Sequence, residues 1–81
     1  MSFNPTPYTL HPTPSINLQV NGETRSSLAQ TPLPELLQLL GFNPREVAVE
    51  YNGEILHHQF WLDTKVENGD RLEVVTIVGG G

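Results

Sequence analysis

The stretch NGDRLEVVTIVGGG, residues 68–81, places a turn signal, a strand pattern and a run of glycines in direct succession. Asn68-Gly69-Asp70 is typical of a turn, because asparagine and glycine tolerate a positive φ. Beyond it, apolar and polar side chains alternate with the period of two that marks a strand with one buried face. The sequence therefore predicts a final strand over residues 71–77. The side chains on its first face are Leu72, Val74 and Thr76.

A similar alternation occurs near the start of the chain. Ile16, Leu18 and Val20 alternate with polar residues and predict a first strand. Asn21-Gly22 follows, a dipeptide that suits a tight hairpin turn. The return strand over residues 23–27 is polar, so we expect it at a sheet edge.

The segment between Thr31 and Gly41 has the pattern of an amphipathic helix. We expect Thr31 to cap it and Pro32 to open it, because a missing N–H costs nothing at the first helical position. Gly41 is expected just past its end, and Pro44 prevents its continuation. The leucines that share its buried face are Leu33, Leu36, Leu37 and Leu40.

Residues 47–51 alternate again and predict a third strand, which ends at a second hairpin signal, Asn52-Gly53. Residues 54–57 can pair back across it. The stretch HHQFWLDTKV, residues 57–66, has no clean period. We therefore expect a short strand or an irregular turn there, with Trp61 anchored inward.

This order of elements predicts an α+β fold in which one main helix packs on one face of a mixed sheet of about four to five strands. We place the first and last strands together in the centre, parallel to each other if the helix is the crossover. That arrangement is the β-grasp, or ubiquitin-like, fold. We expect it to occupy residues 16–77, between an N-terminal arm, residues 1–15, and a flexible tail, residues 78–81.

The arm is set apart by its composition. Residues 1–15 contain four of the seven prolines and no charged side chain. Proline restricts the backbone and removes N–H donors, so we expect a disordered, extended arm with polyproline II character. Its role is open between a ligand for an aromatic groove and a plain tail.

Composition limits the function classes. A chain of 81 residues supports one small domain and leaves little room for a deep catalytic cleft. The lack of cysteine excludes disulfides and thiolate chemistry. A net charge of −5 with only 4 Lys and Arg residues argues against nucleic-acid binding and favours an electropositive protein partner. No apolar run is long enough for a membrane and no signal-peptide pattern is present, so we expect a monomeric cytoplasmic protein.

The candidate chemical groups inside the domain do not form a catalytic pattern. His57 and His58 would point to opposite faces of a strand, so no metal site is predicted. Ser26-Ser27 has no partnered His and Asp, and a lone tryptophan is more often a core residue than a ligand platform. Three carboxylates recur at intervals of four but span a strand and its turn, as in a solvated face: Glu46, Glu50 and Glu54. We therefore expect no enzyme activity.

The glycine tail is the exception. Each glycine is roughly 0.5 to 1 kcal/mol less favourable than alanine within an element, so three in a row form no stable structure. We expect Val78, Gly79 and Gly80 to thread into a narrow channel that a Cβ would block. The tail would deliver the carboxylate of Gly81. An ATP-using partner would overcome the poor reactivity of that carboxylate by forming an acyl-adenylate.

Several of these segments together resemble the ThiS family, the sulfur carriers of thiamine biosynthesis. They are NGE after the first strand, PELLQLLG in the helix, VAVEYNGEIL, Trp61 and the ending ENGDRLEVVTIVGGG. The resemblance covers residues 16–81, and its last segment is the most specific. The arm of residues 1–15 and Pro34, early in the helix, depart from the family pattern, but neither touches the tail.

The resemblance implies a cycle in which the chain catalyses nothing and binds no cofactor of its own. A ThiF-type adenylating enzyme, consuming ATP and Mg²⁺, would join the Gly81 carboxylate to AMP. Sulfur from a persulfide donor, fed by a cysteine desulfurase, would then convert Gly81 to a thiocarboxylate. A ThiG-type thiazole synthase would take that sulfur for the thiazole of thiamine.

Two alternatives stay open, because a Gly-Gly ending alone is shared with the small subunit of molybdopterin synthase and with ubiquitin-related modifiers. The chain would then be a molybdopterin-type carrier, or a covalent modifier that joins Gly81 to a lysine. The second alternative is a non-covalent β-grasp interaction module whose glycines are merely a flexible end.

A docking surface is also predicted from the last strand. Val75 and Ile77 lie on its second face, and one helix can cover only one face of a small sheet. We therefore expect both to be at least partly exposed and to dock the adenylating enzyme and thiazole synthase.

Overall fold

The computed structural model of the chain describes residues 14–77. The predicted arm, residues 1–15, lies outside the described residues except for its last two. The predicted tail, residues 78–81, lies wholly outside them, so both assignments stay predictions.

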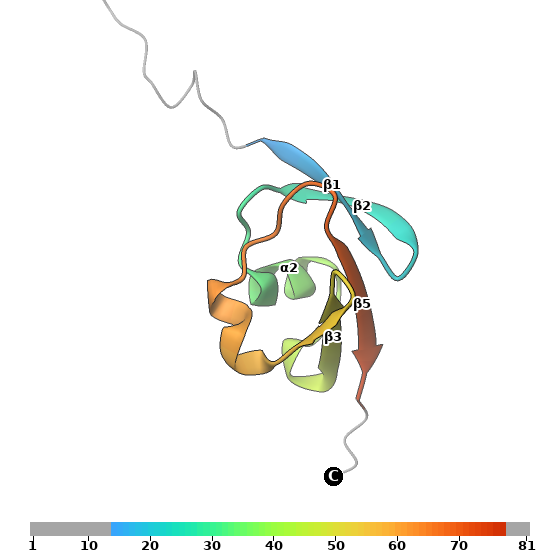
Figure 1. Ribbon diagram of the computed structural model, residues 1–81, viewed down its shortest axis with the longest axis vertical. Coiled ribbons are helices and arrows are strands. Elements are labelled where there is room, and N and C mark those ends of the chain that lie inside the picture. The colour runs from blue at the N-terminus through green and yellow to red at the C-terminus, as the bar shows by residue number, and fades with distance from the viewer. Residues whose placement is uncertain (1–13, 78–81) are drawn as a thin grey trace, which may run out of the picture.

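Five strands form one mixed sheet in the order β2-β1-β5-β3-β4 (Figure 1). β1 and β5 run parallel, whereas the other neighbours are antiparallel. The β-grasp prediction is thus confirmed, as are the parallel pairing of the first and last strands and the edge position of the second. β5 is the central strand, and β1 lies beside it. The bounds are Ser15–Val20 for β1, Glu23–Leu28 for β2, Val47–Tyr51 for β3, Glu54–Leu56 for β4 and Arg71–Thr76 for β5.

Both hairpins turn on the predicted Asn-Gly dipeptides. Asn21 and Gly22 have φ values of 52° and 84°, and Asn52 and Gly53 have 52° and 91°. Positive φ at both central residues is the signature of the type I′ turn, whose twist matches that of the flanking strands.

The helix α2, Leu33–Leu39, lies across one face of the sheet (Figure 1). Its predicted apolar face is confirmed, because Leu33, Leu36 and Leu37 are buried and Leu40 packs against them. Gly41, with φ 96°, ends the helix as predicted. The N–H of Gly41 donates to Gln38 and that of the next residue to Leu37, which is the Schellman arrangement.

The predicted start of the helix is wrong. The hydroxyl of Thr31 does not cap the helix but donates to the carbonyl oxygen of Leu28 at 2.7 Å. Pro32 is extended and lies outside the helix, because it forms a β-bridge with Lys65. This backbone pairing, which also joins Val66 N–H to the Thr31 carbonyl, holds the segment straight until Leu33.

The stretch after β4 also differs from the prediction of a short strand or irregular turn. His58–Asp63 forms a 3₁₀ helix, η2. Another 3₁₀ helix, η1, spans Pro44–Glu46 and lies between α2 and β3. Trp61 is anchored inward as predicted, with 3% of its surface exposed. Its indole N–H donates to the Leu56 carbonyl at 2.9 Å, so one buried side chain ties the whole segment to the end of β4.

The core lies between α2, η2 and one face of the sheet. It consists of Ile16, Leu18, Val20, Leu33, Leu36, Leu37, Val47, Val49, Trp61, Val66, Leu72 and Val74. The opposite face of the sheet, here called the open face, carries the alternate side chains of the same strands.

Candidate functional site

The central strand β5 leads the chain towards the glycine residues. On one side it pairs with β3 from Leu72 to Thr76, and the N–H of Ile77 continues this ladder by donating to the Glu46 carbonyl. On its other side the pairing with β1 extends only to Leu72. The last part of β5 therefore has a strand on one side only.

The side chain of Asn21 takes the place of a strand beyond the end of β1. Its Nδ2 donates to the Val74 carbonyl at 3.1 Å, and its Oδ1 accepts from the Val74 N–H at 2.7 Å. Its own backbone N–H donates to the Leu72 carbonyl at 2.9 Å. Asn21 thus satisfies both backbone groups of Val74, which would otherwise be unpaired in a partly buried position. In the sequence, Asn21 is recognisable only as a turn residue.

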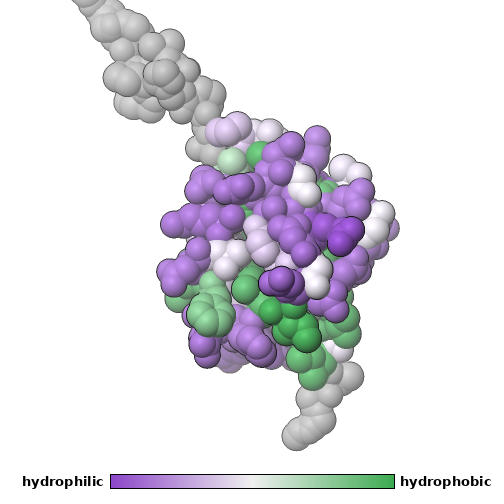
Figure 2. All heavy atoms as spheres, viewed as in Figure 1, coloured by the Kyte–Doolittle hydropathy of each residue, from purple (hydrophilic) through white to green (hydrophobic). Residues whose placement is uncertain are grey.

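The apolar residues predicted to be exposed on β5 are exposed. Val75 has 62% of its surface accessible and Ile77 has 51%. Ile55 on β4 is 68% accessible, and Ala48 on β3 lies directly opposite Val75 in the register. We call these four residues the open-face patch. Figure 2 shows hydrophobic side chains gathered at this end of the described chain, next to the end of β5.

A shallow groove of about 300 Å³ lies on the open face and includes three of the four residues of this patch. It is lined by Ala48, Val49, Glu50, Ile55, Glu73 and Val75. The groove therefore combines aliphatic side chains with two carboxylates. Val75 is recognisable from its place in the last strand, but Ile55 and Glu73 reach this site only through the pairing of β3 with its two neighbours.

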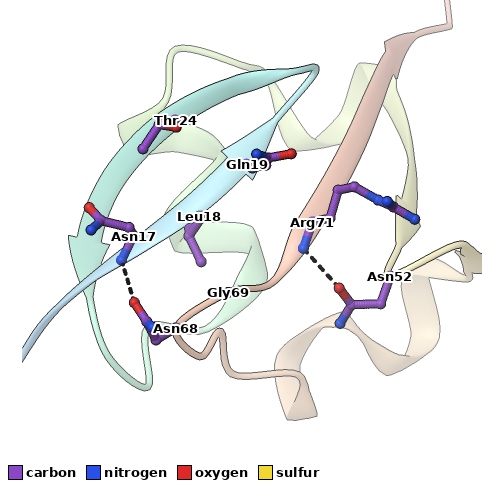
Figure 3. Close-up of a pocket in the computed structure, with 8 residues that line it drawn as sticks. All are labelled: Asn17, Leu18, Gln19, Thr24, Asn52, Asn68, Gly69 and Arg71. Carbon is purple, nitrogen blue, oxygen red and sulfur yellow. Dashed lines mark hydrogen bonds between the residues drawn. The ribbon is translucent and has the colours of Figure 1, made fainter.

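A second hollow, of about 480 Å³, lies between the β1–β2 hairpin and the start of β5 (Figure 3). Two of its amide side chains hold backbone: Asn68 accepts from the N–H of Asn17 at 2.9 Å, and Asn52 accepts from that of Arg71 at 2.8 Å. The residues drawn there offer amides, one hydroxyl and one guanidinium, without a nucleophile paired to a base. This hollow is best explained as a structural junction at which two turns are hydrogen-bonded to the strands β1 and β5.

Asp70 is the hub of a neighbouring hydrogen-bond cluster. Its carboxylate accepts from the Tyr51 hydroxyl, from Asn52 Nδ2 at 3.1 Å and from the backbone N–H of Glu67 at 2.8 Å. Burial first, and then the hydrogen bond to and the charge of Asp70, raise the pKa of Tyr51 above its usual range. The phenol therefore stays a proton donor, and the cluster ties the end of β3 to the turn before β5.

The remaining candidate groups, two histidines, two serines and three glutamates, either contact neighbouring residues of the fold or are exposed. The ring of His58 lies 4.0 Å from that of Trp61, centroid to centroid, and His57 precedes η2. The hydroxyl of Ser26 donates to Asn17 Oδ1 at 3.4 Å, and that of Ser27 to the Leu28 carbonyl at 3.3 Å. As predicted for a solvated face, three carboxylates are exposed: Glu46, Glu50 and Glu54.

Two features are absent from residues 14–77. No group of three or more His, Asp or Glu side chains among them could hold a metal ion. Within the same residues, no helix is long and apolar enough to cross a membrane.

Within residues 14–77, the mixed five-stranded sheet with one main helix across one face defines a class, the small ubiquitin-like proteins of the β-grasp fold. Within this class the chain belongs to the ThiS family, whose sequence profile matches residues 18–81.

Similar proteins agree with this assignment. The crystal structure of the thiamine biosynthesis protein ThiS from Geobacter metallireducens is 35% identical, with a TM-score of 0.70, over 82% of this chain and 100% of that one. An uncharacterized protein of Pyropia yezoensis, ycf40, is 42% identical over 83% of this chain and 94% of its own length. A thiazole synthase of Paramagnetospirillum magneticum is 41% identical over 82% of this chain, but the match spans only 20% of that protein.

Proposed function

We propose that this chain is a sulfur carrier of thiamine biosynthesis and that its reactive group is the carboxylate of Gly81. The observation that carries the proposal is the family match, which runs through the glycine residues to Gly81 rather than stopping at the folded part. The end of β5, with the open-face patch beside it, supports the proposal because it would bring a partner to the chain shortly before those glycines.

The first step activates Gly81. A carboxylate oxygen attacks the α-phosphorus of ATP on an adenylating enzyme of the ThiF type, pyrophosphate leaves with Mg²⁺, and an acyl-adenylate forms. The hydroxyls of Ser26 and Ser27 donate to an amide oxygen and a backbone carbonyl rather than to a base, and we assign the chemistry of activation to the partner.

The second step exchanges oxygen for sulfur. The terminal sulfur of a protein persulfide, fed by a cysteine desulfurase, attacks the acyl carbon and AMP leaves. The acyl disulfide so formed is cleaved by a second thiol, which releases Gly81 as a thiocarboxylate and leaves a disulfide on the donor side. The thiocarboxylate is anionic near neutral pH, and its sulfur is the more nucleophilic atom.

The third step delivers the sulfur to a thiazole synthase of the ThiG type. Support for this partner comes from the thiazole synthase of Paramagnetospirillum magneticum, in which a segment similar to this chain makes up 20% of the protein. A thiazole synthase of Magnetococcus marinus shows the same division, with 36% identity over 20% of its length. A domain joined to an enzyme in some chains is a natural partner of that enzyme in others.

Mass spectrometry tests the proposal directly. After incubation with the adenylating enzyme, MgATP and a persulfide donor, the intact chain is expected to gain about 16 Da, because one oxygen is replaced by sulfur at Gly81. Fragmentation should place the gain on the last residue, and omission of ATP should prevent it. An unchanged mass under complete conditions contradicts the proposal.

The same experiment separates two of the alternatives, and a transfer assay with a thiazole synthase or a molybdopterin precursor as the acceptor separates the third. A covalent modifier would appear as a conjugate joined through an isopeptide bond to a lysine. A molybdopterin-type carrier would be loaded with sulfur but would pass it to a molybdopterin precursor and not to a thiazole synthase. An interaction module would show no ATP-dependent change at all.

The docking role of Val75 and Ile77 is tested by the double variant V75S/I77S. We expect the KM of the adenylating enzyme for the carrier to rise roughly 10- to 100-fold with little change in kcat, since exposed apolar anchors carry interface energy. The free energy of unfolding should change by about 0.5 kcal/mol or less, because both side chains are largely exposed. The matched control is L28S/L39S, which removes two exposed leucines from β2 and α2. A rise in KM of equal size in the control would argue against a specific patch.

A further inference from the structure

Two carboxylates face each other across the middle of the open face. Glu50 on β3 lies directly opposite Glu73 on β5 in the antiparallel register, and both are exposed. Directly opposed residues have Cβ atoms roughly 4.5 to 5.5 Å apart, at which distance like charges destabilise a sheet. This pair therefore costs the fold stability, and the sequence alone did not place the two residues together.

The cation on the same face of β5 is turned away from the pair. Arg71 precedes Glu73 by two residues and so points to the same side of the sheet. Its guanidinium, however, lies over the β3–β4 turn, where a Cβ placed on Gly53 would be 4.0 Å from it. Figure 3 shows the side chain reaching towards the strand end that carries Asn52. The other described cations lie on β2, in η1 and beyond η2, and they are Arg25, Arg45 and Lys65.

The carboxylate pair also lines the aliphatic groove. Ile55 lies opposite Glu50 on the far side of β3, and Val75 is the next open-face residue after Glu73 along β5. Both aliphatic side chains and both carboxylates line the 300 Å³ groove. A ligand of this groove therefore needs an apolar group and a positive charge a few ångströms apart.

We propose that this groove docks a partner segment in which a lysine or arginine inserts between Glu50 and Glu73 while a neighbouring aliphatic side chain packs on Ile55 and Val75. The inference rests on the proposed function, in that the partner is the adenylating enzyme. The cation would relieve the repulsion within the pair, so the attraction gained on binding exceeds that of a single rim charge.

Other occupants fit less well. A second copy docked through the same face by two-fold symmetry would bring four carboxylates into one interface. The N-terminal residues 1–13 of the chain contain no Lys or Arg that could neutralise the pair. The net charge of −5 likewise favours an electropositive partner.

The test uses the double variant E50Q/E73Q, with E23Q/E35Q as the matched control. Both variants lose two carboxylates from the net charge of −5, but only the first loses them from the groove. Binding to the purified adenylating enzyme is measured by calorimetry without nucleotide, and pyrophosphate release is measured with ATP. We expect E50Q/E73Q to weaken binding and raise KM roughly 10-fold, with kcat within about twofold of wild type. Its affinity should lose most of its salt dependence, and its midpoint of unfolding should be unchanged or higher.

Any other outcome counts against either the docking inference or the proposed function. Equal weakening by E23Q/E35Q, or unchanged binding by E50Q/E73Q, overturns the docking inference. The same holds if the wild type does not bind the enzyme, or if it forms a dimer that the groove variant dissociates. Binding of the wild type without pyrophosphate release refutes the proposed function, but it leaves the docking inference standing if E50Q/E73Q weakens that binding.

Discussion

Deletion of Gly80 and Gly81 is expected to abolish sulfur loading while leaving the fold as stable as before. The shortened chain would still end in a carboxylate, but that group would lie roughly 7 Å back along an extended tail. A misplacement of 1 Å can already cost about 100-fold in rate, so we expect a loss of at least roughly 1,000-fold. Intact mass after incubation with the adenylating enzyme, MgATP and the persulfide donor measures the loading.

Stability is the second readout of this deletion. The core residue nearest the tail in sequence is Val74, and the last described backbone bond of the β5 ladder is that of Ile77. Both precede the deleted residues, so the urea midpoint should match that of the wild type. The variant G80A keeps the reach of the tail but adds one Cβ. A loss of loading in G80A would indicate a narrow channel, whereas normal loading would indicate that only the length of the tail matters. Normal loading of the deleted chain would mean that Gly81 is not the reactive residue.

The sheet was largely predictable from the sequence because its signals are local. Alternation of apolar and polar side chains in residues 16–20 and 71–74 identifies a buried face, and the Asn-Gly dipeptides fix two hairpin turns through their positive φ. The helix end was equally local, since Gly41 adopts the left-handed conformation that glycine favours. These features depend on neighbours within a few positions along the chain.

The errors occurred where distant residues decide the local structure. Thr31 looks like a helix cap, but the bridge between Pro32 and Lys65 keeps this segment extended. Residues 58–63 have no period because a single side chain, Trp61, is buried there. No propensity rule anticipates a contact that spans about thirty residues, and tertiary contacts of this kind override local preference.

The candidate site shows the same division. The exposure of Val75 and Ile77 followed from counting faces, because one helix leaves one face of a sheet uncovered. The opposition of Glu50 and Glu73 follows from the register of β3 on β5, which a shift of one residue would destroy. The residues of the patch on the last strand could be predicted from the sequence. The residues that lie beside them could be placed only from the register of the strands.

Trp61→Ala is expected to be the most damaging single substitution in the domain outside the tail. Truncation of a buried aromatic side chain costs about 3 to 5 kcal/mol, which approaches the entire stability of a small domain. The loss also leaves the Leu56 carbonyl without its indole donor and frees η2 from the end of β4. Urea denaturation followed by circular dichroism measures the effect, since the variant has no tryptophan fluorescence.

Two further variants assign the Trp61 effect to its causes. Trp61→Phe keeps an aromatic ring in the core but removes the N–H to Leu56, so we expect a loss of about 1 to 2 kcal/mol. Leu62→Ala changes the next residue of η2, whose side chain is 75% accessible, and should cost about 0.5 kcal/mol or less. If Trp61→Ala were no worse than Leu62→Ala, η2 would not belong to the core. A graded loss of stability, largest for Trp61→Ala, intermediate for Trp61→Phe and smallest for Leu62→Ala, would instead show that one inward side chain holds η2 against the core.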